Sequence, residues 1–217
     1  MSGNALILHD YWRSGASYRV RIALNLKGVP YELAPHDLRI GAQHAPTYKA
    51  IAPQGLVPAL EADGLVLTQS PAILEWIDER WPQPALLPVD RDARAIVRAM
   101  CALIACDIHP LNNLRVLKAV RQLTGSDEGA EKAWITRWIS EGFEALETLV
   151  SQYGRRFAYG DTVTLADCTL VPQLFSAARF GVDLAPFPRL VAVGLEANRL
   201  APVQSAHPTQ QPDAQAL

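Results

Sequence analysis

A proline-rich stretch divides this sequence into two parts of different character. Pro82, Pro84 and Pro88 each remove a backbone N–H donor and restrict the residue before them, so no regular helix can run through the stretch. Short apolar runs separated by turn residues precede it, whereas only helical periodicity follows it. The sequence therefore predicts a first domain over residues 1–82, a linker over 83–89 and a second domain over 90–217.

The first domain begins with a strand, a helix and a strand. Apolar residues 5–8 and residues 30–34 predict the two strands, and residues 17–27 predict a helix that ends at Gly28 in the C-terminal capping position. Apolar side chains on two sides of this helix indicate that it is covered on both.

The rest of this domain predicts a hairpin and a final helix. After an irregular region with one short helix at 47–51, two short apolar runs flank Asp63-Gly64, which is the strongest local hairpin signal. Ser70-Pro71 then opens a helix that reaches residue 81, with a capping serine and a proline in the first turn. This order, with Pro58 at the head of the third strand, is the plan of an α/β thioredoxin-like domain.

The second domain is predicted to be all-α. Its helices are expected, in order, over residues 90–120, 127–152, 165–180 and 190–200. Thr164 and Asp167 have the spacing of a capping box at the start of the third of these helices. Residues 202–217 are rich in proline and glutamine and are expected to lack regular structure.

Composition excludes several classes of function. The 217 residues are 49% hydrophobic, which is enough to fill real cores, and 20 basic against 22 acidic residues give a net charge of -2. Because no block of lysine or arginine is present, nucleic acid and anionic membranes are poor partners. The apolar run at the start is too short for a signal peptide or a membrane span, so we expect an untargeted, cytoplasmic protein.

The three cysteines, Cys101, Cys106 and Cys168, lie in apolar, helix-like sequence. An odd number of cysteines in such surroundings is typical of reduced cytosolic thiols that serve as small core residues. Their spacing fits no zinc site, and no metal is expected.

The turn before the first helix is the reactive position of a thioredoxin-like domain, and here it reads Arg13-Ser14-Gly15-Ala16-Ser17. Without a cysteine pair it cannot exchange disulfides, but a hydroxyl near a helix N-terminus is suited to holding an anion. Lowering the pKa of a bound thiol from about 8.5 to about 7 needs roughly 2 kcal/mol, and one hydrogen bond to a charged group supplies about 1.5–3 kcal/mol. One serine is therefore enough, although on this turn alone a capping role for Ser14 or Ser17 is the simpler interpretation.

A second helix start that could bind an anion lies at Gln69-Ser70, where backbone amides and a hydroxyl meet before Pro71. Capping alone explains it equally well. Two such helix starts on one small domain nevertheless match a short peptide with a thiol at one end and a carboxylate at the other, and glutathione is that peptide.

The first helical region of the second domain contains an unusually polar stretch. Asp107, His109, two asparagines and Arg115 fall close together beside Pro110. Burying these groups in a packed core would be costly, so the stretch predicts a polar cleft. Arg179, taken alone, reads as a solvated charge favoured by the dipole at a helix end.

With these residues in view, the chain resembles the zeta class of glutathione transferases, the maleylacetoacetate isomerases, over nearly its full length. The resemblance rests on residues 13–24, Val57-Pro58 with Gln69-Ser70, residues 109–113, Arg179-Phe180 with residues 182–184, and His207-Pro208 with Gln211-Pro212-Asp213. The Gln-Ser pair with its proline occurs in glutathione transferases generally, whereas the first motif and the tail are specific to this class. Bacterial maleylpyruvate isomerases are similar in the Asp-Ile-His-Pro segment and in an arginine that matches Arg115. The glutathione transferase fold, a thioredoxin-like domain followed by an all-α domain, is implied.

The resemblance also implies a role for each matching residue. Ser14 would stabilise the thiolate, Gln69 and Ser70 would hold the γ-glutamyl end, and Val57, before a cis-Pro58, would pair its backbone with the cysteinyl unit. Asp107 would face the glutathione of the partner subunit, which implies a homodimer. The implied glutathione-binding residues are Ser14, Gln43, Val57, Gln69, Ser70, Asp107, His109 and Asn113. The implied catalytic residues are Ser14 and Arg13, and the implied cationic wall for a dicarboxylate substrate is Arg13, Arg115 and Arg179.

One departure from the family pattern bears on the substrate. Ala16 stands where the family usually has cysteine, and Gly15 stands in place of the second serine, whereas Ser14 is retained. The difference favours the maleylpyruvate relatives.

The implied activity is a glutathione-dependent cis-to-trans isomerisation in aromatic and tyrosine catabolism. It would convert maleylacetoacetate to fumarylacetoacetate, or maleylpyruvate to fumarylpyruvate, with glutathione as a regenerated cofactor. One alternative is conjugation, peroxidase or dehalogenation chemistry on apolar electrophiles, which three arginines in the pocket disfavour. The other is a non-catalytic binding module, which an intact Ser14 and Gln69-Ser70 disfavour.

Overall fold

The computed structural model describes residues 6–215, which form two compact units. The first unit comprises the described residues up to Leu86 together with the segment from Arg199 onward, and the second is Leu87–Asn198. The chain passes from one unit to the other inside the stretch predicted as a linker. The described residues from Arg199 onward belong to the first unit, whereas the sequence predicts them in the second domain.

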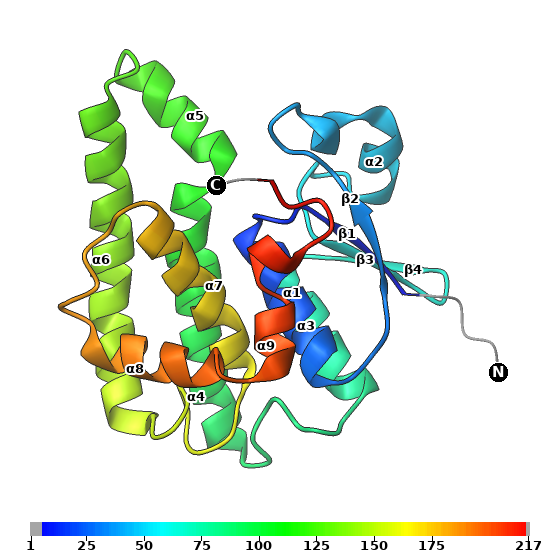
Figure 1. Ribbon diagram of the computed structural model, residues 1–217, viewed down its shortest axis with the longest axis vertical. Coiled ribbons are helices and arrows are strands. Elements are labelled where there is room, and N and C mark those ends of the chain that lie inside the picture. The colour runs from blue at the N-terminus through cyan, green and yellow to red at the C-terminus, as the bar shows by residue number, and fades with distance from the viewer. Residues whose placement is uncertain (1–5, 216–217) are drawn as a thin grey trace. The chain divides into compact units, whose positions relative to one another are not determined.

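The first unit is built on a four-stranded mixed sheet (Figure 1). Its strands are β1 (Ile7–Asp10), β2 (Glu32–Pro35), β3 (Ala59–Ala62) and β4 (Leu65–Thr68). They lie in the order β2-β1-β3-β4, with β1 and β2 parallel and the other pairs antiparallel. Helices α1 (Gly15–Leu26) and α3 (Ser70–Arg80) pack against each other beside the sheet, and α2 (Pro46–Ile51) precedes β3. The predicted thioredoxin-like order is confirmed; Ala5, predicted in the first strand, lies outside the described residues.

The hairpin turn follows from its sequence. Asp63 and Gly64 have φ angles of 50° and 83°, so both central residues adopt the left-handed region. A two-residue turn of that kind matches the twist of the strands on either side and favours Asp-Gly. The local signal is therefore sufficient to set the register of β3 against β4.

A buried ion pair fastens the end of α1 to α3 and to the start of the linker. Lys27 Nζ donates to Asp78 Oδ1 at 2.6 Å and to the Pro84 carbonyl at 2.5 Å, and the same Asp78 oxygen accepts from the Leu86 N–H at 2.7 Å. With both charges hydrogen-bonded, the pair avoids the cost of an uncompensated buried ion. This arrangement fixes the last residues of the first unit before the helical unit begins.

The second unit is all-α, as expected. Its helices are α4 (Arg91–Ala102), α5 (Leu114–Leu123), α6 (Glu128–Tyr153), α7 (Leu165–Arg179) and α8 (Pro188–Ala197). The prediction of one helix over 90–120 is wrong, because a π-helical turn at Leu103–Ile108 and a 3₁₀ turn at His109–Asn112 separate α4 from α5. Pro110 lacks the N–H that a continuous α-helix needs, and Asn113 caps a new helix through its side chain.

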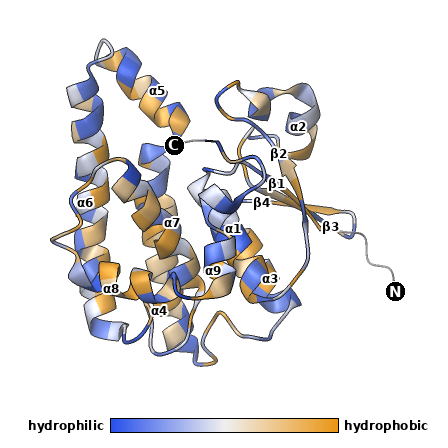
Figure 2. Cartoon of the chain, viewed as in Figure 1, coloured by the Kyte–Doolittle hydropathy of each residue, from blue (hydrophilic) through white to orange (hydrophobic). Residues whose placement is uncertain are grey.

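Helix α7 is buried along most of its length. Nine consecutive residues, Leu165 to Gln173, are buried, and apolar colouring runs along the helix in Figure 2. Its predicted capping box is confirmed: Thr164 Oγ1 accepts from the Ala166 N–H, and Asp167 Oδ2 accepts from the Thr164 N–H at 2.8 Å. The Ala158 N–H also donates to Asp167, at 2.8 Å, so one buried carboxylate joins the preceding loop to the helix start.

The C-terminal segment is ordered, which contradicts the expectation for residues 202–217. It contains helix α9 (Ala201–Ser205) and a 3₁₀ turn at Pro208–Gln210. The segment packs on α1, where Asn25 Nδ2 donates to the Pro202 carbonyl at 3.1 Å. Proline and glutamine give no strong local preference, but contacts to distant parts of the chain supply the order; residues 216 and 217 lie outside the described part.

The cysteines differ in their surroundings. Cys168 is buried, as expected, and Cys101 is partly buried, but Cys106 is exposed within the single chain and the expectation of a core role is wrong there. None of the three forms a disulfide bond in the part of the chain that the structure describes. One stretch among the described residues, Arg91–Asn112, is long and apolar enough to span a membrane by length and composition, and only 22% of its most apolar window is buried.

Candidate functional site

Three segments singled out from the sequence meet at one edge of the sheet in the first unit. His9 of β1 lies opposite Ala59 of β3, which in turn lies opposite Thr68 of β4. The chain leaves β1 toward Ser14, enters β3 from Val57-Pro58, and leaves β4 toward Gln69-Ser70 at that same edge. A buried apolar cluster lies beneath, formed by Tyr11, Trp12, Tyr48, Ala52, Val57 and Ala59. The structure therefore brings the two predicted helix starts and the proline loop together.

Ser14 is the N-cap of α1. Its Oγ accepts from the Ser17 N–H at 3.2 Å, and its own N–H donates to the Tyr11 carbonyl at 2.8 Å. A hydroxyl has one hydrogen and two lone pairs, so capping uses a lone pair and leaves the O–H to donate. Capping and thiolate stabilisation, the two interpretations of this serine, are therefore compatible in one residue.

Arg13 lies beside the capping serine and is partly buried. Its guanidinium carbon lies 5.6 Å from the centre of the Trp12 ring, within the range of a cation–π contact. The contact holds a positive charge next to the position where an anion would bind.

The start of α3 carries Gln69 and Ser70. Gln69 is exposed and has a φ of 69°, a left-handed conformation, and its Nε2 donates to Gln54 Oε1. Ser70 is buried, and its Oγ accepts from Arg19 Nη1 at 3.1 Å. A buried cation thus stands behind this helix start, in addition to its amides and dipole, and favours an anion there.

The loop before β3 contains a cis peptide bond between Val57 and Pro58, as the family resemblance implies. Within the described part of the chain, neither backbone group of Val57 has a hydrogen-bond partner. Gln43 lies in the 3₁₀ turn Ala42–His44, and its buried Oε1 likewise has no partner among the described residues. Such groups are costly unless something satisfies them, and a peptide ligand could do so.

The remaining predicted residues belong to the second unit, in two groups. Asp107 is exposed in the π-helical turn, His109 begins the 3₁₀ turn, and Asn113 caps α5 by accepting from the Arg115 N–H at 3.1 Å. The Arg115 side chain is exposed. The second group is Arg179 at the end of α7, whose guanidinium carbon lies 4.0 Å from the centre of the Phe180 ring.

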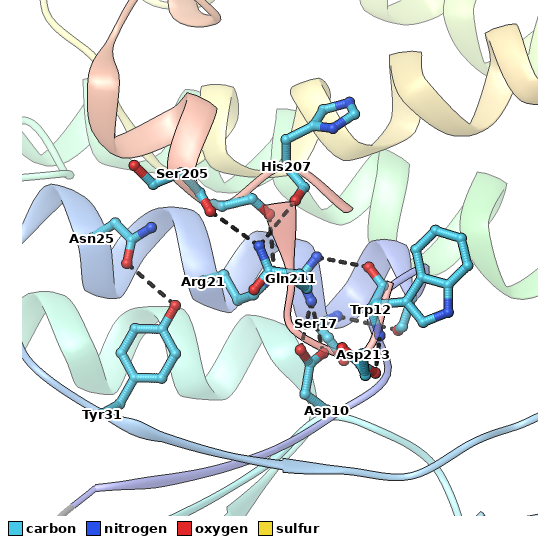
Figure 3. Close-up of polar contacts among 12 residues, drawn as sticks. Asp10, Trp12, Ser17, Arg21, Asn25, Tyr31, Ser205, His207, Gln211 and Asp213 are labelled. Carbon is cyan, nitrogen blue, oxygen red and sulfur yellow. Dashed lines mark hydrogen bonds and ion pairs between the residues drawn. The ribbon is translucent and has the colours of Figure 1, made fainter. Parts of the chain in front are cut away.

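A buried network behind the Ser14 turn is not among the features predicted from the sequence (Figure 3). Arg21 is completely buried, and its Nη1 donates to both Asp10 carboxylate oxygens at 2.8 and 2.7 Å. Burial raises the pKa of the Asp10 carboxyl, and the Arg21 charge opposes that rise. Two arginines, Arg19 and Arg21, in a helix apolar on both sides were the available signal, because a buried guanidinium requires partners.

Comparison with known proteins identifies the family. The model of the glutathione S-transferase N-terminal domain matches residues 13–80, and that of the C-terminal domain matches residues 132–193. The chain therefore belongs to the glutathione S-transferase family. A curated relative from Ralstonia sp., named maleylpyruvate isomerase, is 51% identical over 209 residues, which are 95% of this chain and 99% of the relative.

Solved structures narrow this to the zeta class. The holo structure of maleylpyruvate isomerase, described as a bacterial zeta-class glutathione S-transferase, is 50% identical, covers 96% of this chain and 100% of its own, and has a TM-score of 0.94. Maleylacetoacetate isomerase from Anaeromyxobacter dehalogenans, with bound dicarboxyethyl glutathione and citrate in its active site, is 44% identical, covers 99% and 96%, and has a TM-score of 0.89. The chain is a zeta-class member of the family.

Proposed function

We propose that the protein is a glutathione-dependent cis–trans isomerase of maleyl dicarboxylates. The single observation that carries the proposal is the Ser14 hydroxyl, which caps α1 through a lone pair and keeps its hydrogen to donate to a thiolate. The relatives named maleylpyruvate and maleylacetoacetate isomerase support this activity over general conjugation, peroxidase or dehalogenase chemistry.

The first unit fits glutathione as the cofactor. The unsatisfied backbone of Val57 suits an extended peptide unit, and the orphaned Gln43 Oε1 suits a donor at the glycyl end. The α-carboxylate of the γ-glutamyl end would be held by the amides and hydroxyl at Gln69-Ser70, where Arg19 adds positive charge. Asp107, His109 and Asn113 of the second unit complete the proposed set of glutathione-binding residues.

When bound, glutathione supplies a thiolate that adds reversibly to the activated double bond and makes it a single bond. Rotation about that bond, followed by loss of the thiolate, gives the trans isomer. Ser14 Oγ–H donates to the sulfur and lowers the pKa of the thiol, and the N-terminus of α1 contributes in the same direction. Arg13, Arg115 and Arg179 are the proposed binding groups for the substrate carboxylates, and their fixed positive charge stabilises the enolate oxygen that develops. The dicarboxyethyl glutathione in the Anaeromyxobacter enzyme is the chemical form that thiol addition to a butenedioate would give.

We propose a homodimer whose interface includes α4 and the π-helical turn. This region lies in the apolar stretch Arg91–Asn112, and only 22% of the most apolar window of that stretch is buried within the chain. Ala95, Ala99, Ala102 and Cys106 are exposed at spacings that place them on one helix face. A second copy of the chain would cover this apolar face and remove it from water, which is favourable. Three cysteines of which none forms a disulfide bond among the described residues support a cytoplasmic location.

Three assays on the purified protein test the function. We expect calorimetry to detect glutathione binding, and the protein with glutathione to isomerise maleylpyruvate and maleylacetoacetate far faster than it conjugates chlorodinitrobenzene. The faster of the two maleyl acids identifies the substrate class, and Ala16 favours maleylpyruvate. Binding of glutathione with no isomerisation would refute the isomerase and favour a transferase, whereas no binding would leave only the binding-module alternative.

A further inference from the structure

The C-terminal strap, defined here as residues 206–215, lies against the turn that carries Ser14, within the first unit (Figure 3). Several contacts fasten it. The Ala206 carbonyl accepts from Arg21 Nε at 3.0 Å, Asp213 Oδ2 accepts from the Trp12 N–H at 3.2 Å, Ala214 packs against the apolar cluster, and Gln215 Oε1 accepts from Arg39. The strap therefore reaches the turn from residues about two hundred positions away.

The strap and Arg21 together hold both backbone groups of one residue. The Trp12 N–H donates to Asp213, and the Trp12 carbonyl accepts from Arg21 Nη2 at 2.9 Å. The next two residues in the chain are Arg13 and Ser14. With both peptide planes of Trp12 held, the path of the chain into the α1 cap is restrained, and with it the position of the Ser14 backbone, while Ser14 Oγ is held by the Ser17 N–H.

The strap is braced both internally and against the end of α9, so it can act as a firm support. Gln211 is buried, and its Nε2 donates to the Ser205 carbonyl at 3.0 Å and to the His207 carbonyl at 2.9 Å (Figure 3). Pro208 is buried and restricts the backbone of the 3₁₀ turn. These contacts limit the movement of the strap that would otherwise carry Asp213 away from Trp12.

We propose that Asp213 is a positioning residue for the thiol site: its hydrogen bond to the Trp12 N–H holds the turn so that Ser14 Oγ–H points at the glutathione sulfur. The inference rests on the proposed function for its catalytic meaning, but the contact it invokes belongs to the protein without ligand. The strap thus links Asp213 to the proposed thiol chemistry at Ser14.

The test uses two variants of Asp213 and one matched control. Asp213→Ala removes the acceptor, whereas Asp213→Asn removes the charge and keeps an oxygen that can accept from Trp12. Asp161→Ala removes the same charge from an exposed aspartate of the helical unit. Each protein is examined by amide hydrogen exchange without glutathione, by calorimetry with glutathione, and by the ultraviolet absorbance of the bound thiolate as a function of pH.

We expect Asp213→Ala to speed exchange of the amides in residues 12–17, to raise the pKa of bound glutathione by about one unit and to weaken glutathione binding about tenfold, as loss of one positioning hydrogen bond predicts. Asp213→Asn and Asp161→Ala should behave like the wild type. An Asp213→Ala protein that melts at a lower temperature but keeps the wild-type thiol pKa and exchange would overturn the proposal, because the strap would then only stabilise the fold.

An Asp213→Asn protein as impaired as Asp213→Ala would overturn it too, since the hydrogen bond would not be the cause. If the wild type takes up no glutathione, the proposed function fails, and the exchange measurement still decides whether Asp213 holds the turn.

Discussion

Ser14 caps α1, and we propose that it also donates a hydrogen bond to the thiolate; one mutation removes both, and two measurements tell the effects apart. In Ser14→Ala both the α1 cap and the donor to the thiolate are lost. We expect the pKa of bound glutathione to rise by about one to two units, because a hydrogen bond to a charged group is worth about 1.5–3 kcal/mol. Loss of the cap should cost about 1 kcal/mol of unfolding free energy. Thiolate absorbance and urea unfolding measure the two effects.

Ser14→Thr is the matched control, because threonine keeps a hydroxyl that can both cap and donate. It should retain most of the thiolate and most of the stability. A Ser14→Ala protein with unchanged isomerase activity would remove this serine from the mechanism, whatever happens to its stability.

Arg115 tests the cationic wall. The Arg115 backbone N–H donates to Asn113 Oδ1. Its side chain is exposed, so the guanidinium is accessible to a substrate carboxylate. Arg115→Ala should raise KM for the dicarboxylate about tenfold or more while the affinity for glutathione stays the same, since an ionic hydrogen bond is worth about 1.5–3 kcal/mol. Arg91→Ala, at an exposed arginine that begins α4, is the control. Equal KM values in wild type and Arg115→Ala would exclude the residue.

At the scale of elements, Gly142 explains how a long helix can support the irregular turn beside it. A Cβ at Gly142 of α6 would lie 2.3 Å from Ile108 Cγ1 and 2.4 Å from Ile108 Cδ1, and Ile108 is completely buried at the end of the π-helical turn. Gly142→Ala should therefore cost about 1–3 kcal/mol of stability through overpacking and should weaken glutathione binding through displacement of His109. Thermal unfolding and calorimetry measure both effects.

The double variant Gly142→Ala/Ile108→Ala supplies the control for this contact. Removing the atoms that clash should make the combined cost smaller than the sum of the two single costs. Strict additivity would show that the two residues do not oppose each other.

The capping box of α7 predicts a pH effect. Burial raises the pKa of Asp167 to about 6, against an ordinary value of 3.8, so the folded state holds the proton more tightly than the unfolded state between those values. The contribution of this group to stability is therefore complete below about pH 4 and falls by roughly 3 kcal/mol as the pH rises past 6.

Asp167→Asn removes that titration. Relative to the wild type, the variant should gain stability as the pH rises from 4 to 7, even if its absolute stability is lower because the amide has fewer acceptors for the Thr164 and Ala158 N–H groups. Urea unfolding across this range measures the difference. Two profiles that run parallel would contradict the raised pKa, and Asp161→Asn, at an exposed loop position, should give a parallel profile.

These elements also show which features of the fold can be predicted from residues that are close together in the sequence. The hairpin, the α1 cap and the α7 capping box were predictable because each depends on residues within a few positions: Asp63-Gly64, Ser14 and Thr164 with Asp167. The break between α4 and α5 was not, although Pro110 marks it, because a proline can bend a helix or end it depending on what packs around it.

At the scale of the whole molecule, the proposed homodimer has a direct test. The chain mass is 23.7 kDa, and light scattering should give twice that value. Ala99→Glu places a charge in the middle of the exposed small-residue face of α4 and should shift the mass to the monomer. Ala192→Glu, the same change at an exposed position of α8, should remain dimeric. A wild-type protein that is monomeric at micromolar concentration would refute the dimer.

The C-terminal segment, whose order was not predicted, also belongs to this scale. Residues 202–215 were assigned to the helical domain and expected to be irregular, because proline and glutamine carry little local preference. Their order depends on Arg21 and Trp12, which no periodicity links to the tail. The candidate site divides in the same way: local motifs single out the residues of the first unit, whose roles stay predictions, whereas the buried groups behind them, Asp10 and Arg21, depend on the tertiary fold.

The place of residues 199–215 in the first unit has a consequence for synthesis. A ribosome releases the β-strands and α1 long before it reaches Asp213, and it makes the whole helical unit in between. The pairing of Trp12 with Asp213 spans 201 positions, a separation at which chain closure is slow. During synthesis the amino-terminal unit therefore stays incomplete, with Arg21 only partly paired, until the helical unit and the segment from Arg199 onward have been made.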